Sequence, residues 1–155
     1  MAAIPRTTAR VVPVSPDGAC LLLLERDPLR PDEPWWGTIG GASDPGESLE
    51  ETVVRELWEE TGIVIEGSAL TAPFHRRVTE FSWNGTAYVG DSTVFAVGLA
   101  RETPVTFSHL VTEEVDTVLE ARWFTPAEAA ADGRLMWPDL PDVLAAAVIA
   151  VEGRP

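Results

Sequence analysis

One unusually acidic segment limits the folds open to this chain of 155 residues more than any other feature. Residues 44–60 carry seven acidic side chains and one basic one, Arg55. Like charges three or four positions apart repel each other on a helix, and acids in a last turn oppose the helix dipole. The same segment nevertheless places Leu49, Val53 and Leu57 at the spacing of a buried helical stripe. The fold must therefore bury one face of an acidic helix and compensate its charge.

The ends of this helix are marked by local signals. Ser48 and Glu51 have the spacing of a capping box, and Gly62 is a natural C-terminal stop. Glycines at 40 and 41 precede the helix and let the backbone approach another group closely. The sequence therefore predicts a helix that begins after Ser48 and ends before Gly62.

Three carboxylates share one edge of the predicted helix. At about 100° per residue, Glu56 and Glu60 stack one turn apart and Glu59 lies beside them. This edge borders the apolar stripe, so we expect the cluster at the rim of the core. Converging carboxylate oxygens are the ligands that Mg²⁺ and Mn²⁺ prefer as hard cations. The alternative is a solvated acidic face, which is what most charge runs are.

Strand and helix signals alternate along the rest of the chain, with no internal repeat and no linker. Two pairs of strands have turn sequences between them, at residues 15–18 and at Asn84-Gly85. We expect strands over residues 8–14, 19–25, 37–39, 76–83, 86–89, 92–100 and 117–124, and further helices from Pro126 and from about Pro141. The pattern predicts an α/β or α+β fold, with a mixed sheet covered by helices, in a single domain over residues 1–155.

Composition narrows the function classes. A net charge of −14 opposes stable binding to a nucleic acid or an anionic membrane. Residues 1–10 lack the apolar core of a signal peptide, and the longest apolar run, 143–151, is short of the roughly 20 residues that span a bilayer. Cys20 lies in an apolar run and is expected to be a buried structural thiol. We therefore expect a soluble, cytoplasmic protein.

The acidic segment also matches a fixed pattern. The segment from Gly41 to Ile63 resembles the Nudix box, G-x5-E-x7-R-E-U-x-E-E-x-G-U with U aliphatic. Five residues separate Gly41 from Glu47, seven separate Glu47 from Arg55, and residues 55–63 read RELWEETGI. Every fixed position is present, and the sequence at 122–126 is similar to the late strand and helix start of that family. One departure is Ile39, which stands where members often have proline. The resemblance implies a Nudix-like α/β/α sandwich with a mixed sheet between helices.

The resemblance also implies roles for the residues of the box. Glu56, Glu59 and Glu60 would hold Mg²⁺ or Mn²⁺, and the carbonyl of Gly40 would be a further ligand. Arg55 would orient a carboxylate through a bidentate pair. Glu47 precedes the helix and would brace the loop through that arginine rather than touch the main metal.

The implied reaction is attack by water on the diphosphate linkage of a nucleoside diphosphate joined to another group. A carboxylate must accept the proton of that water. In similar enzymes this base is a box glutamate, such as Glu56 or Glu59, or an acid of a later loop, here Glu113 or Glu114. For the two later residues, a plain solvent-exposed role is the alternative.

Contacts to the substrate are expected from residues outside the box. Trp35 and Trp36 precede the catalytic loop and could stack on a nucleobase, with core packing as the alternative. Arg76 could hold a substrate phosphate, with a surface role as the alternative. The partner is thus a small nucleotide-type diphosphate, and a homodimer is a further expectation because Nudix proteins often dimerise. The competing hypothesis is an inactive Nudix-like nucleotide-binding or regulatory module, which the intact set of box carboxylates argues against.

Overall fold

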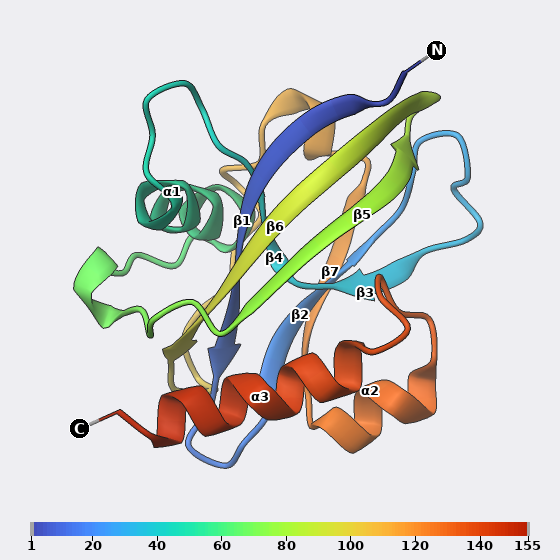
Figure 1. Cartoon of the computed structure of the whole chain (residues 1–155). Helices are drawn as coiled ribbons and strands as arrows, with labels where there is room; N and C mark the ends of the chain where they lie inside the picture. Colours follow the sequence, from blue (N-terminus) through green and yellow to red (C-terminus); the bar gives the residue numbers. More distant parts are fainter. Residues whose placement is uncertain (1, 155) are drawn as a thin grey trace.

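Seven strands and three α-helices follow one another in the computed structural model, which describes residues 2–154 (Figure 1). The strands are β1 Ile4–Val14, β2 Cys20–Glu25, β3 Trp35–Gly37, β4 Ile39–Ala42, β5 His75–Trp83, β6 Thr86–Gly98 and β7 Val118–Phe124. The helices are α1 Leu49–Thr61, α2 Pro126–Asp132 and α3 Leu140–Glu152, and two short 3-10 turns are η1 Gly67–Ala69 and η2 Thr112–Glu114.

The strands form one mixed sheet, as predicted. Its main order is β3-β2-β1-β6-β5, and in addition β4 pairs with β1 and β7 pairs with β2. Strand β1 runs parallel to β6, with Ile4 opposite Tyr88 at one end and Val14 opposite Gly98 at the other. All the other pairings are antiparallel. Strand β1 therefore lies at the centre of the sheet, between β2 and β6.

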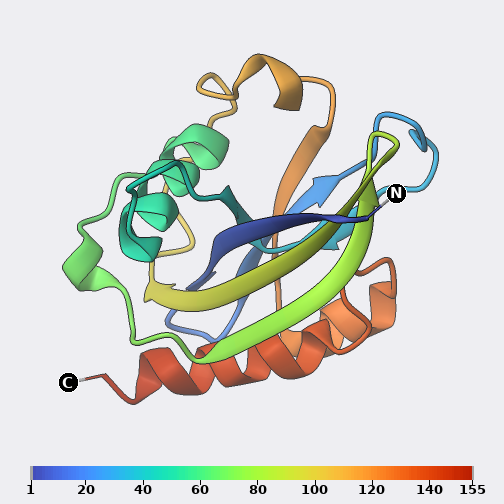
Figure 2. The same ribbon diagram turned by 45° about the horizontal axis from the view of Figure 1, so that its top comes forward.

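Alternation along the strands divides the core into two layers. Val11 faces the layer that holds Val53 and Leu57 of α1, whereas Val12 faces the layer that holds Leu140 and other residues of α3. Successive residues of a strand point to opposite faces of the sheet, so both faces are covered. Figure 2 shows α1 on one side of the sheet and α2 and α3 on the other. The predicted α/β/α sandwich is confirmed.

Two predicted strands are one strand in the structure. Residues 86–89 and 92–100 were predicted as two strands, but β6 continues through Gly90 and Asp91, which lie between them. Gly90 lies opposite Thr79 of β5, and a Cβ atom there would lie 2.9 Å from the ring of Phe81. The missing side chain therefore makes room for an aromatic ring and does not end the strand. Strand β1 also begins earlier than predicted, because backbone pairing with β6 extends back to Ile4.

The two predicted turns are present. Asn84 and Gly85 join β5 to β6 with φ values of 49° and 83°, the positive values that a two-residue hairpin turn favours. Gly18, with φ of 81°, closes the turn between β1 and β2, which pair at Val14 and Cys20. Over residues 2–154, the longest helices of this fold are too short or too polar to cross a lipid bilayer.

Candidate metal and phosphate site

The acidic helix has both of its predicted ends. Ser48 accepts a hydrogen bond from the backbone of Glu51, whose carboxylate accepts one from the backbone of Ser48, which completes the capping box. Gly62 ends the helix in the left-handed conformation with φ of 74°. Between these ends Glu56 and Glu60 are buried, as the predicted edge position requires. The local sequence thus fixes which carboxylates the helix carries into the protein.

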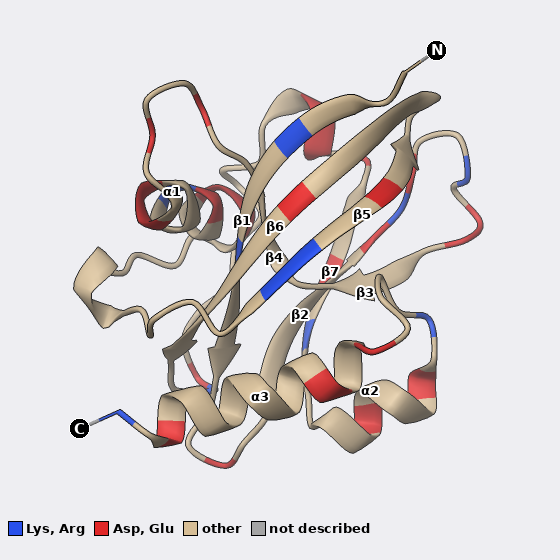
Figure 3. Ribbon diagram, in the orientation of Figure 1, with Lys and Arg blue, Asp and Glu red and all other residues tan. Residues whose placement is uncertain are grey.

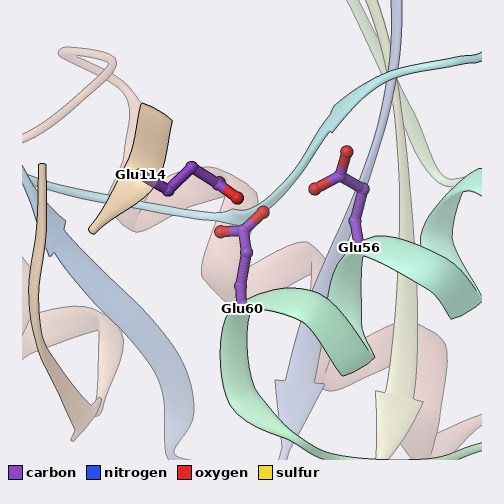
Figure 4. Close-up of side chains that lie close together, drawn as sticks. All are labelled: Glu56, Glu60 and Glu114. Carbon is purple, nitrogen blue, oxygen red and sulfur yellow. The ribbon is translucent and has the colours of Figure 1, made fainter. Parts of the chain in front are cut away.

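A glutamate from a distant loop joins two carboxylates of α1. Glu56, Glu60 and Glu114 each place a carboxylate oxygen within 4.8 Å of the others. Figure 4 shows Glu60 and Glu114 with their carboxylates facing each other, and Glu56 one turn away on the same side of α1. Glu114 belongs to η2, the turn that leads to β7. The fold therefore brings together acids that are far apart in sequence.

Glu60 is the most enclosed member of this cluster. Its side chain is 0% exposed, and its Oε1 accepts a hydrogen bond of 3.2 Å from the backbone N–H of Gly40. Its Oε2 is buried and has no hydrogen-bond partner within residues 2–154. Burial of a carboxylate oxygen without a partner lowers the stability of the fold, so a proton or a cation bound to this atom would stabilise the protein.

Arg55 connects the helix to the preceding loop. Its Nε and Nη2 donate to the two carboxylate oxygens of Glu47 at 2.8 and 2.9 Å, which confirms the predicted brace. Its Nη1 donates to Glu56 at 3.0 Å and to Glu59 at 3.2 Å, and Nη2 also reaches the carbonyl of Ala42 at 3.0 Å. All three guanidinium nitrogens are engaged, so Arg55 holds three acids in fixed positions relative to one another.

The acids of this region differ strongly in pKa. Hydrogen bonds from Arg55 lower the pKa of Glu47 to about 2. Burial, reinforced by neighbouring carboxylates, raises the pKa of Glu114 to about 7 and that of Glu60 well above its usual range. Burial is also the main reason that the pKa of Glu25, at the end of β2, rises to about 7. Glu47 is therefore ionised at neutral pH, whereas the raised pKa values of Glu60, Glu114 and Glu25 favour their protonated forms in the absence of a cation.

The two glycines before α1 permit the close approach of these groups. A Cβ atom on Gly41 would lie 2.7 Å from Oε1 of Glu56, so a side chain there would displace that carboxylate. Gly40 has φ of 149°, and a Cβ atom there would lie 2.3 Å from the carbonyl oxygen of Ala9 in β1. The chain can therefore pass between β1 and the acids only where both side chains are absent.

The donor set fits a hard divalent cation. It consists of carboxylate oxygens on one rigid helix and one loop, with a buried oxygen that lacks a partner. Mg²⁺ and Mn²⁺ bind such oxygen ligands, and their charge would offset both the cost of burying ionised carboxylates and the repulsion between them. Figure 3 shows acidic positions on α1 and also on α2, α3, the sheet and the loops, with fewer basic positions among them.

A large cavity of about 820 Å³ opens beside the acid cluster. One end is lined by acids and the glycines before α1, and includes Glu56, Glu59 and Glu114. The other end has aromatic walls, formed by Trp35, Phe81, Trp83 and Trp137. Trp35 and Trp83 meet edge to face, with ring centroids 6.0 Å apart. The cavity thus joins a polar, metal-compatible end to an apolar end that suits a flat ring.

The structure brings together most of the predicted site residues. Those that line the cavity are Gly40, Arg55, Glu56, Glu59, Glu113, Glu114 and Trp35. Glu60 does not line the cavity and is the least exposed member of the acid cluster. Glu59 is held by Arg55 and is not one of the three acids whose oxygens converge.

Two predicted substrate contacts lie elsewhere. Trp36 is 0% exposed and packs edge to face on Phe124, so its position supports the core-packing alternative. Arg76 is exposed and donates to both carboxylate oxygens of Asp91, at 2.9 and 2.7 Å. Neither side chain is part of the cavity lining.

Sequence reasoning missed several residues of the cavity. Glu25 and Arg10 lie on strands whose apolar pattern gave no indication of chemistry, and Trp83 and Trp137 enter from the β5–β6 hairpin and from the segment before α3. Glu114 was predicted as a base and not as a metal ligand. Only the pairing of distant strands brings these side chains together, so no local spacing could reveal them.

Comparison with known proteins gives a consistent family match. The family model described as NUDIX domain matches residues 4–146. An uncharacterised Nudix hydrolase of Rhodococcus erythropolis is 33% identical over 106 residues, which are 66% of this chain and 53% of that protein. This chain spans only 7% to 53% of the lengths of the first three relatives that it matches.

Solved structures agree on the fold. The MutT protein of Methanosarcina mazei Go1 has a TM-score of 0.64 at 21% identity, with 94% of each chain covered. A MutT NUDIX hydrolase of Burkholderia pseudomallei has a TM-score of 0.61 at 26% identity, with 80% of this chain and 85% of that chain covered.

Proposed function

This chain belongs to the NUDIX domain family, and from that membership we propose that it is a hydrolase dependent on Mg²⁺ or Mn²⁺. Its substrate would be a nucleoside diphosphate linked to another group, and the bond broken would be the diphosphate linkage. The observation that carries this proposal is the buried, unpartnered Oε2 of Glu60, which lies with Glu56 and Glu114 beside a cavity of about 820 Å³. An acidic face in open solvent would show neither feature.

Glu56, Glu60 and Glu114 are the residues that would hold the metal, together with Glu59 and the carbonyl of Gly40. When bound, the metal would neutralise charge that develops on the phosphoryl oxygens and lower the pKa of a water molecule. The chain must then supply a group that accepts the proton of this water.

Three acids at the cavity are suited to accept that proton: Glu113, which is not among the proposed metal ligands, and Glu59 or Glu114 where the metal leaves a carboxylate oxygen free. Glu59 is held in place by Arg55, and Glu113 and Glu114 reach the cavity from the loop before β7. Arg55 acts as a positioning residue in this scheme, because its donors are engaged by acids and by a backbone carbonyl. It sets the spacing of the carboxylates and leaves the phosphate to other groups.

The aromatic end of the cavity would hold the nucleoside part of the substrate. Trp35 is the one predicted stacking residue that lines it, and Trp83 and Trp137 supply further flat surfaces. An aromatic pair of this kind contributes about 0.5–1.5 kcal/mol beyond the buried area. The predicted homodimer and the predicted cytoplasmic location stay predictions.

A hydrolysis screen tests the proposal. Purified protein is incubated with nucleoside triphosphates, nucleotide sugars, dinucleoside polyphosphates and dinucleotide cofactors, with and without Mg²⁺, and released phosphate or nucleotide is measured. We expect turnover of at least one class only with the metal. Turnover of none, together with metal-dependent nucleotide binding, would instead support the inactive-module alternative.

Variants of α1 connect the activity to the acid cluster. Glu60→Gln and Glu59→Gln keep the side-chain size but remove charge, so each should lower turnover by about 100-fold. Glu50→Gln is the matched control, because this glutamate is exposed in the first turn of the same helix. Equal turnover in all three variants would contradict the proposed role of the acids.

A further inference from the structure

Arg10 of β1 is a cation at the acid end of the cavity whose donors are largely free. It pairs with Gly40 across the β1–β4 ladder, and its side chain packs so closely that a Cβ atom on Gly40 would lie 2.8 Å from its Cγ. Its Nη1 donates to the carbonyl of Thr38 at 3.1 Å. Its Nε is buried and finds no acceptor in the described part of the chain.

The other cations of the cavity are placed differently. Arg55 has all its guanidinium nitrogens engaged, as described above. Arg6 lies four residues before Arg10 on β1, and its guanidinium is 5.4 Å from the ring centre of Tyr88. Arg10 is therefore the cation that combines a position beside the acid cluster with N–H groups that can still be used.

Carboxylates surround Arg10 without pairing with it. Glu25, Glu56 and Glu60 are the acids that act on its charge, while burial lowers its pKa. None of the ion pairs formed within residues 2–154 involves its guanidinium. A partly buried guanidinium with an unused N–H is stabilised by an acceptor anion, and its planar fork matches phosphate oxygens.

We propose that Arg10 binds a phosphoryl group of the substrate, the one of the two phosphoryl groups in the diphosphate that the acid-bound metal does not hold. This inference rests on the proposed function and adds to it a substrate-binding residue, with the two phosphoryl groups held by different cations. A diphosphate carries negative charge on the oxygens of both of its phosphoryl groups, so the acid cluster repels the second phosphoryl group unless a cation lies beside it. Arg10 is that cation, and Gly40 is the residue that lets it lie against the site.

The test compares binding of two probes to Arg10→Gln and to the unchanged protein. The first probe is Mn²⁺ alone, and the second is methylenediphosphonate, a diphosphate analogue that cannot be hydrolysed, in the presence of Mg²⁺. Calorimetry should show that Arg10→Gln weakens binding of the analogue by about tenfold or more. Binding of Mn²⁺ should be unchanged or a few-fold tighter, because a positive charge beside the acids has been removed.

The difference between the two probes, weaker binding of the analogue without weaker binding of Mn²⁺, separates phosphate binding from other roles of Arg10. A residue that only balances the charge of the acids would tighten Mn²⁺ binding and leave the analogue unaffected, and that result would overturn the inference. Equal loss of both probes would indicate a structural role and would also overturn it. Arg101→Gln removes an arginine that pairs with Asp17 outside the cavity, and it should change neither probe.

A second variant keeps the inference testable if Arg10→Gln does not fold. Arg10→Lys keeps the charge but loses the planar fork, so it should weaken binding of the analogue while Mn²⁺ binding stays at the level of the unchanged protein. Full analogue binding by this variant would overturn the role of the fork. Failure of the unchanged protein to bind Mn²⁺ or to hydrolyse any substrate would count against the proposed function itself, which distinguishes the two failures.

Discussion

Gly41 shows how a single position without a side chain determines the shape of the acid cluster. The ideal Cβ position at this residue is 2.7 Å from Oε1 and 2.9 Å from Cδ of Glu56. Glu56 cannot easily move away, because its carboxylate also accepts a hydrogen bond from Arg55 and the residue is 7% exposed. The conformational freedom of this glycine matters less than the space that it leaves.

Gly41→Ala should therefore disturb both stability and metal binding. Overpacking of this kind costs about 1–3 kcal/mol in the free energy of unfolding, and displacement of the Glu56 carboxylate should weaken Mn²⁺ binding. Urea unfolding and Mn²⁺ titration measure the two effects. Gly67→Ala is the matched control, because no atom lies within 4 Å of its Cβ position. Similar behaviour of the two variants would show that the space beside Glu56 is not needed.

At the scale of elements, one arginine joins α1 to its neighbours. Arg55 contacts the loop through Glu47, β4 through the carbonyl of Ala42, and its own helix through Glu56 and Glu59. Exposed ion pairs contribute little to stability, but a network with bidentate geometry contributes more. This network is what allows an acidic helix end to remain packed against the sheet.

Arg55→Lys tests the network because lysine keeps the charge and loses the fork. We expect a melting temperature lower by several degrees and hydrolysis slower than in the unchanged protein, since Glu47 and Glu59 can no longer be held together. Arg134→Lys serves as control, because Arg134 pairs with the single neighbouring acid Asp132. Differential scanning calorimetry and the substrate identified in the screen provide the two measurements. An equal, small effect in both variants would show that charge alone is sufficient.

The elements also show where prediction from the sequence succeeds and where it fails. Helix α1 was predicted with its correct ends because Ser48 and Gly62 are local signals that act through the adjacent backbone. The carboxylates of Glu56 and Glu60 followed from helical periodicity. The residues of β6 were predicted as two strands, because the sequence does not show that the ring of Phe81 in β5 lies against Gly90. Arg10 and Glu25 were missed because their chemistry depends on which strands become neighbours.

For the whole molecule, half-buried acids create a dependence of stability on pH. The pKa values of Glu25 and Glu114 rise from 4.5 to about 7 in the folded protein. The folded state therefore retains protons in a range where the unfolded chain has lost them, and stability falls as pH rises. The acids with lowered pKa, such as Glu47 at about 2, are ionised in both states above roughly pH 6, so they add no slope there.

Metal-free protein should therefore be less stable at about pH 8 than at about pH 6. Thermal unfolding in EDTA at these two pH values gives the comparison, and added Mn²⁺ should reduce the difference, because a cation replaces the protons on the acids. Glu114→Gln should reduce the pH dependence of the metal-free protein. A melting temperature that rises over this range would contradict the assignment of raised pKa values to the cluster.

The central position of β1 has a consequence for the order in which contacts form while the chain is synthesised. This strand precedes the other six in the chain, yet its parallel neighbour β6 ends at Gly98, 84 residues after the Val14 that it pairs with. Contacts so distant in sequence form slowly, because a long loop must close first. During synthesis one edge of β1 therefore stays unpaired until β6 has been made, and Glu114 can join Glu56 and Glu60 only after the second half of the chain has been made.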